Sequence, residues 1–246
     1  RTRRHHAERL GQRGHCTGGA HDGAGAGCGG ETLLYRGYFV VTHGTRAILG
    51  PKPAAIGAGA KALTDMVWWF MLFWTPDLFS RVFKMSQAEL GGPIAVIYSM
   101  AALGALSSGF AFPMLLNRGL SPNAARKASM LFYSVLILPI PLALNVDSPW
   151  AAAGLIGLAL FAHQGFSTNI FGFTADTVPI QRVATVMAVG AVFGNLTGMA
   201  MIEFTGWSLT HDVGYWPMFA IAASAYLLAT LWIHVLVPVI RPVSSD

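Results

Sequence analysis

The sequence predicts an all-α, polytopic membrane protein built as a six-transmembrane-helix bundle. Only 11% of its 246 residues are charged and 54% are hydrophobic, whereas soluble chains carry charge on about a quarter of their residues. The apolar residues are gathered into long runs, and a run of about 20 residues is the length of a helix that crosses a bilayer. This composition excludes disordered, collagen-like and disulfide-stapled proteins.

The basic charge of the chain is concentrated at its N-terminal side. Residues 1–61 hold nine of the 16 Lys and Arg residues, and the rest of the chain, with seven basic and eight acidic residues, is nearly neutral. We expect residues 1–53 to form an irregular, low-complexity segment. Its arginines suit a nucleic-acid-binding arm, but non-native sequence joined to a membrane-protein fragment is at least as good an interpretation, and we expect no nucleic-acid partner.

The two cysteines of the chain also lie in this segment. Cys16 and Cys28 are twelve residues apart in Gly-rich sequence, without a C-x-x-C spacing. This arrangement favours free thiols over a metal site, so we expect neither a metal nor another cofactor.

Six apolar runs follow, and each is long enough to span a membrane as a helix. Only helices and closed barrels satisfy their backbone groups in lipid, and these runs are too long and too uniformly apolar for barrel strands of about ten residues. We therefore expect a bundle over residues 54–241 and a cytoplasmic tail at 242–246. The expected spans are approximately 54–79, 93–116, 124–146, 150–174, 181–206 and 215–240.

Turn-forming residues separate these runs, and prolines interrupt one of them. Pro139 and Pro141 lie inside the third run, where they should kink the helix. In chain order, the separating turns are Pro76-Asp77, Gly91-Gly92-Pro93, Gly119 to Pro122, Asp147-Ser148-Pro149, Val178-Pro179 and Gly214 to Pro217.

The charges between the spans predict their orientation. The loops after the third and fifth spans carry Asp147 and Asp212 and no Lys or Arg. Positive residues stay on the cytoplasmic side, so we expect both termini to be cytoplasmic. The positive residues that set this orientation are Arg118, Arg126, Lys127, Arg182 and Arg241.

Polar side chains recur near the middle of the first, fourth and fifth spans, where they are costly and therefore functional candidates. Each has a structural alternative, because amides and hydroxyls bond neighbouring helices and Lys61 can extend to the membrane surface. Lys61 can also pair with Asp65 four residues later. The candidate substrate-binding residues are Lys61, Trp69, His163, Gln164, Ser167, Asn169 and Asn195.

These residue types indicate the chemistry of a ligand. Amides hydrogen-bond hydroxyl groups, an ammonium neutralises a carboxylate, and an aromatic face stacks on a sugar ring. A pocket with all three suits a polyhydroxylated carboxylate.

Several longer stretches carry a resemblance to a known family. They look like the C-terminal half of a major facilitator transporter, and most resemble the hexuronate/sugar-acid group of anion:cation symporters. The resemblance covers residues 58–240. The stretches are AKALTDMVWWFMLFWTPDLF (60–79), LLNRGLSPNAARK (115–127), AHQGFSTNIF (162–171) and GNLTG (194–198).

The resemblance implies a fold and an activity. Family members are bacterial inner-membrane proteins with twelve helices in two halves, and they import sugar acids with protons. In the family, the position of Lys61 contacts substrate, and the positions of Gln164–Asn169 and Asn195 face the central cavity. The six helices of the N-terminal half, which carry the residues linked to proton coupling, are absent from this chain.

The resemblance favours secondary transport of a sugar acid, of hexuronate or aldonate type, by a chain that is a C-terminal half and does not transport alone. Its expected partners are the lipid bilayer, a sugar acid, a coupling proton, and a complementary N-terminal half or a second copy. An alternative is a homodimeric six-span carrier or channel for small organic anions. We do not expect an enzyme, because His163, Asp176 and Glu203 lie at different depths and form no H-E-x-x-H motif. The choice of sugar acid, and of protons or sodium, stays open.

Overall fold

The computed structural model describes residues 52–239, with side-chain surroundings from residue 55 onward. The predicted irregular segment lies outside the described residues apart from its last two positions, and the predicted tail lies wholly outside them. Within 52–239 the chain is entirely helical, as predicted. Its elements are α2 (Lys52–Val82), α3 (Gly91–Asn117), α4 (Pro122–Leu136), the 3-10 helix η1 (Ile140–Leu144), α5 (Pro149–Thr177), α6 (Ile180–Thr210) and α7 (Trp216–Leu236).

Each predicted apolar run coincides with a helix, and the third is interrupted where its prolines predict. The turn predicted at Pro76-Asp77 is wrong, because α2 continues through Pro76 to Val82. The α4 helix ends at Leu136, and η1 continues the run from Ile140. At its start, Pro122 follows the N-cap Ser121, whose hydroxyl accepts a hydrogen bond from the amide of Ala124 at 3.3 Å. A proline in this position is tolerated because the first amides of a helix have no partner within it.

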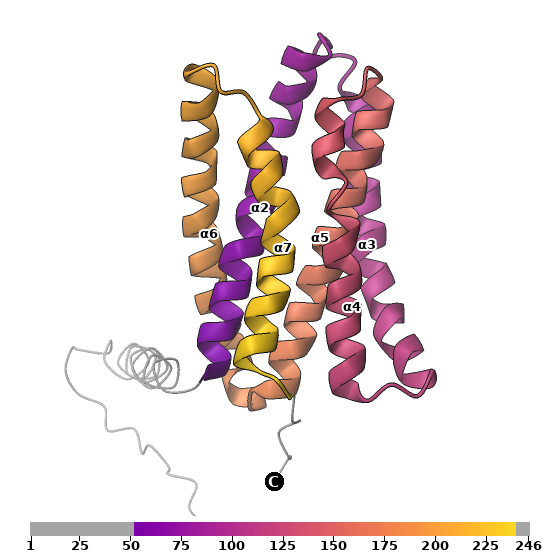
Figure 1. Cartoon of the computed structure of the whole chain (residues 1–246), viewed down its shortest axis with the longest axis vertical. Coiled ribbons are helices and arrows are strands. Elements are labelled where there is room, and N and C mark those ends of the chain that lie inside the picture. The colour runs from indigo at the N-terminus through magenta and orange to yellow at the C-terminus, as the bar shows by residue number, and fades with distance from the viewer. Residues whose placement is uncertain (1–51, 240–246) are drawn as a thin grey trace, which may run out of the picture. The chain divides into compact units, whose positions relative to one another are not determined.

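The helices pack side by side, with α2 and α5 at the centre of the contacts (Figure 1). The α2 helix packs chiefly against α6 and also against α7 and α5. The α5 helix packs chiefly against α3 and also against α4, while α4 and α7 contact each other. Segments that are far apart in sequence therefore meet at α2 and α5.

Four of the six predicted spans are long and apolar enough to cross a membrane, judged by length and composition. They are α3, Pro122–Leu144, α6 and α7. The other two, α2 and α5, fall short of it because they carry polar residues in their apolar runs. These two helices are enclosed by the others. In α5, 15 of 29 residues are buried, compared with 5 of 27 in α3.

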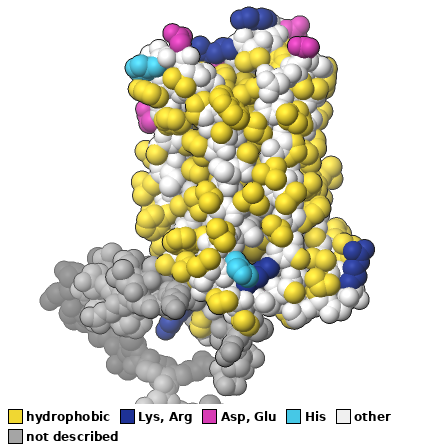
Figure 2. Space-filling view, in the orientation of Figure 1, with side chains coloured by type: hydrophobic (Ala, Val, Ile, Leu, Met, Phe, Trp, Pro, Cys, Tyr) yellow, Lys and Arg dark blue, Asp and Glu magenta, His cyan; other side chains and the backbone are white. Residues whose placement is uncertain are grey.

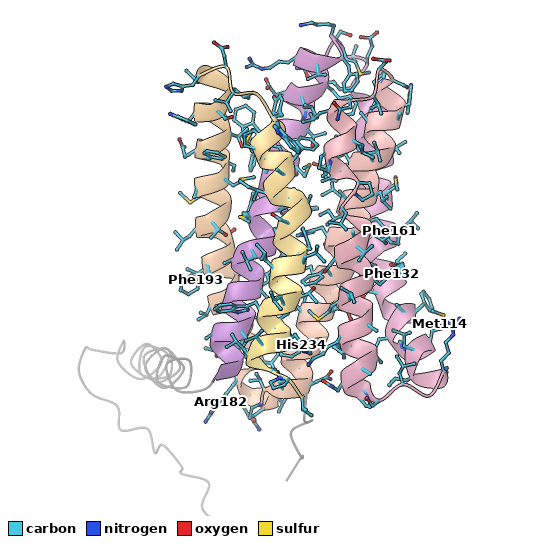
Figure 3. All side chains as sticks on the ribbon, in the orientation of Figure 1. Met114, Phe132, Phe161, Arg182, Phe193 and His234 are labelled. Atoms are coloured by element: carbon cyan, nitrogen blue, oxygen red, sulfur yellow. The ribbon has the colours of Figure 1, made fainter. Side chains whose placement is uncertain are left out.

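The visible exterior of the bundle is apolar over most of its height (Figure 2). Charged side chains gather mainly at the two ends. At one end, Lys127 donates hydrogen bonds to the carbonyls of Val237 at 2.8 Å and Pro238 at 2.6 Å. Arg182 and His234 lie at the same end (Figure 3). This distribution is that of a protein whose sides face hydrocarbon and whose ends face water.

Candidate functional site

An ion pair lies within the helical bundle, on α2. Lys61 Nζ is 2.9 Å from Asp65 Oδ2, and the two side chains are only 11% and 14% exposed. The residues are one helical turn apart, so both project from the same face of α2. The Lys61 nitrogen also lies 5.6 Å from the centre of the Phe171 ring on α5. An ammonium over an aromatic face is attracted by the ring electrons, so α5 supplies a second partner for this charge.

Glycines of α6 make room for this face of α2. A Cβ atom at Gly190 would lie 3.2 Å from Lys61 Cγ, and one at Gly194 would lie 2.4 Å from Asp65 Oδ2. The next glycine of the series, Gly198, faces Trp69 in the same way, at 2.1 Å from its Cδ1. Glycines four residues apart share one helix face, so three turns of α6 lie close against three turns of α2.

A hydrogen bond holds the same contact from the side of α6. The hydroxyl of Thr197 donates to the backbone carbonyl of Ala62 at 2.7 Å. Asn195, the predicted site residue on this helix, is exposed and directly follows Gly194. Its side chain is therefore accessible from outside the bundle.

His163 belongs to a buried cluster that joins three helices. Its Nδ1 shares a hydrogen bond of 2.6 Å with the hydroxyl of Tyr226 on α7. Its ring stacks on Trp68 of α2 with centroids 5.0 Å apart. The Tyr226 hydroxyl also donates to the carbonyl of Thr64 at 3.3 Å. His163 is thus fixed between α2 and α7, one turn from the ion pair.

The other predicted residues of α5 lie on two different faces. Gln164 is half-buried, Ser167 is buried and the neighbouring Thr168 is exposed. Asn169 is completely buried and faces α3 and α4, where its amide donates to Ser108 Oγ at 2.9 Å and Ser129 Oγ at 3.1 Å. Asn169 is therefore not brought together with Lys61.

Three residues of this region were missed by the sequence analysis as site residues. They are Phe171, which lies under the Lys61 ammonium, Tyr226, which bonds His163, and Trp68, which stacks on it. The sequence analysis preferred Trp69, but that ring stacks on Phe73 with centroids 5.7 Å apart. The spacing held a signal for Trp68, which is seven residues after Lys61 and so lies near the same face.

These observations define a class of protein. The chain is a multi-pass helical membrane protein in which a Lys–Asp pair and aromatic rings meet where α2, α5 and α6 pack together. No protein-family model matches the chain.

Curated relatives indicate a more particular kinship. The chain is 23% identical over 163 residues to the D-galactonate transporter of Escherichia coli O6:H1 strain CFT073, which is 66% of this chain and 37% of that protein. It is 24% identical over 173 residues to the hexuronate transporters of E. coli K12 and O157:H7, which is 70% of this chain and 40% of each. The predicted resemblance to sugar-acid transporters of the major facilitator type is thereby confirmed. The chain spans about two fifths of the length of these relatives.

Proposed function

We propose that this chain is the C-terminal six-helix half of a proton-coupled transporter for a hexuronate or aldonate in a bacterial inner membrane. All six helices cross the bilayer in this proposal, and both termini are cytoplasmic. The observation that carries it is the enclosed Lys61–Asp65 pair between otherwise apolar helices, in a chain similar to transporters of sugar acids. Ionisable groups in such positions mark substrate or ion pathways.

The chemistry of the residues supports this class of substrate. A sugar acid carries one carboxylate and several hydroxyls. Lys61 would bind the carboxylate, Gln164 and Asn195 would bind hydroxyls, and Trp69 would contact the sugar face. His163, Ser167 and Asn169, which are buried, would act by fixing the helices around the site.

Exposed polar side chains within the proposed spans support a need for a partner. Thr168 of α5 and Asn195 of α6 are exposed, and exposed polar groups at mid-membrane are costly. In transporters of two halves the substrate lies at the interface between them. A complementary six-helix half, or a second copy of this chain, would cover these residues and complete the cavity.

Direct binding tests the substrate class. The chain, purified in detergent, should bind D-galactonate or D-glucuronate and not neutral D-galactose, measured by calorimetry or tryptophan fluorescence. Lys61→Gln should weaken binding at least about tenfold, which is about 1.4 kcal/mol. Arg182→Gln, which removes an exposed cation in the first turn of α6, is the matched control. This variant should bind the sugar acid like the parent. Equal binding of galactose and galactonate would contradict the proposal.

Uptake tests the need for a second half. Cells that express this chain alone should accumulate no labelled sugar acid. Cells that also express a six-helix N-terminal half from a sugar-acid transporter should do so. Saturable, proton-dependent uptake by the chain alone would instead favour a self-sufficient homodimer.

A further inference from the structure

The partner of Lys61 has no assigned role in the function proposed above. An ammonium that is to bind a substrate carboxylate is already neutralised by the carboxylate of Asp65 at 2.9 Å. A second carboxylate cannot approach it without either sharing the ammonium or displacing Asp65. This competition gives Asp65 a functional consequence.

The side chains of Lys61 and Asp65 differ in how freely they can move. Asp65 is confined by α6, because its carboxylate occupies the space that a Cβ at Gly194 would fill. Lys61 has a flexible four-carbon stem, and its nitrogen lies toward Phe171, a ring that is 50% exposed. An anion that approaches from the side of α5 would therefore draw the ammonium away and leave the Asp65 carboxylate in place.

A carboxylate left in this position would be unpaired and only 14% exposed. Breaking a buried ion pair by removing one partner is strongly unfavourable, because the remaining charge stays buried without compensation. A buried group in this situation becomes neutral by taking up a proton. Displacement of Asp65 by a substrate anion is therefore coupled to protonation of Asp65.

We infer that Asp65 is the internal counter-ion of Lys61 and a proton acceptor of this half, additional to the coupling residues that the resemblance places in the N-terminal half, and that it couples the binding of a sugar-acid anion to the uptake of one proton. This inference rests on the proposed function. In the step, the Lys61–Asp65 contact breaks, a contact between the Lys61 ammonium and the substrate carboxylate forms, and a proton from solution binds the Asp65 carboxylate. One anion and one proton enter a neutral site, which stays neutral.

Two other titratable groups face the pair and are the alternative acceptors. His163 of α5 and Tyr226 of α7 are hydrogen-bonded to each other, and Tyr226 also donates to the carbonyl of Thr64, the residue before Asp65. On α6, the residues against the pair are Gly190 and Gly194, which have no side chain to titrate. A test of the inference must therefore distinguish Asp65 from His163 and Tyr226.

The experiment measures binding of D-galactonate or D-glucuronate to the purified full chain at several pH values, with a pH-indicator dye in weak buffer to count protons. The parent protein should take up about one proton for each anion bound, and its affinity should fall about tenfold per pH unit as pH rises above neutral. Asp65→Asn should bind about tenfold tighter at neutral pH, without proton uptake and without this pH dependence. Glu203→Gln, which removes an exposed acid on α6, is the control and should behave like the parent.

The alternative outcomes overturn either the inference or the proposed function. Anion binding by the parent without proton uptake overturns the inference and needs no variant to fold. Proton uptake that persists in Asp65→Asn but is lost in His163→Gln or Tyr226→Phe also overturns the inference and leaves the proposed function intact. If a sugar acid binds neither to the folded chain nor to the chain purified together with a six-helix N-terminal half, the proposed function itself is overturned.

Discussion

Glycines have different effects at two helix–helix interfaces of the bundle, which we call the α3–α5 seam and the α2–α6 seam. Between α3 and α5, a Cβ at Gly104 would lie 2.1 Å from the backbone carbonyl oxygen of Phe161, so the two backbones touch. Between α2 and α6, the glycines face the side chains of Lys61, Asp65 and Trp69. Small residues in membrane helices are usually explained by close backbone approach. The α2–α6 seam shows that they also make room for charged and aromatic side chains.

The difference has a mechanical consequence. A backbone cannot move aside without shifting a whole helix, whereas a side chain can change its rotamer. Substitutions in the α3–α5 seam should therefore reduce stability most, and those in the α2–α6 seam should reduce it less and also alter the ion pair.

The largest effect is expected in the α3–α5 seam. Gly104→Ala should lower the free energy of unfolding by about 1–3 kcal/mol, the cost of overpacking against atoms that cannot yield. The measurement is the thermal midpoint of the purified chain in detergent. Gly109→Ala on the same helix, where nothing lies within 4 Å of the added carbon, is the control. It should leave the midpoint unchanged or raise it. Equal midpoints for both variants would contradict the backbone contact.

Gly194→Ala, in the α2–α6 seam, should have a smaller effect on stability and a larger one on ligand binding. The added carbon would lie 2.4 Å from Asp65 Oδ2 and 2.9 Å from Asp65 Cβ, so the carboxylate must turn, the two helices must separate slightly, and the contact with Lys61 must lengthen. Sugar-acid binding, measured as above, should change severalfold. Gly206→Ala on the same helix, whose added carbon has one ordinary contact at 3.8 Å, should bind like the parent. A thermal midpoint as low as that of Gly104→Ala would contradict the distinction between the two seams.

A substitution at Asn169, a polar residue of α5 outside the α2–α6 seam, tests whether this side chain stabilises the fold or binds substrate. Asn169→Leu should lower the free energy of unfolding by about 1–2 kcal/mol, because it removes hydrogen bonds to two buried serines. Sugar-acid affinity of the folded variant should be unchanged. Thr168→Ala, the exposed neighbour whose hydroxyl bonds only within its own helix, should not affect stability. A large loss of affinity in Asn169→Leu would instead assign Asn169 to the substrate site.

The smallest effect is expected at the end of the bundle away from Lys127. The hydroxyl of Tyr215 donates to Asp77, which also accepts a bond from Arg81 at 2.7 Å. Burial, with this hydrogen bond and the charge of Asp77, raises the pKa of Tyr215. The raised pKa stabilises the fold below the unfolded-state pKa of about 10, and this contribution is lost as pH rises further.

Tyr215→Phe should therefore cost about 1 kcal/mol between pH 6 and pH 9. Above about pH 10 the difference from the parent should shrink, because the tyrosine of the unfolded parent then ionises while the folded parent still holds its proton, and this lowers the stability of the parent alone. Thermal midpoints across this pH range are the measurement. A difference that grows with pH would contradict the sign of the shift.

Much of the fold follows from patterns that are local to one segment. Apolar runs predicted the helices, Pro139 and Pro141 predicted the break after α4, and the four-residue spacing predicted that Lys61 and Asp65 can pair. The candidate site was less predictable. The sequence predicted Asn169 as a substrate-binding candidate, but its bonds to Ser108 and Ser129 depend on residues 61 and 40 positions away.

The sequence by itself determined that this chain forms apolar helices, that polar groups interrupt α2 and α5, and that it is similar to sugar-acid transporters. Only the tertiary structure decided which polar groups meet. It directed Asn169 toward α3 and α4, Trp68 rather than Trp69 onto His163, and Asp65 against Gly194. The physical reason is that the rotation of one helix against another is set by packing between distant segments, and the periodicity of a single helix carries no information about it.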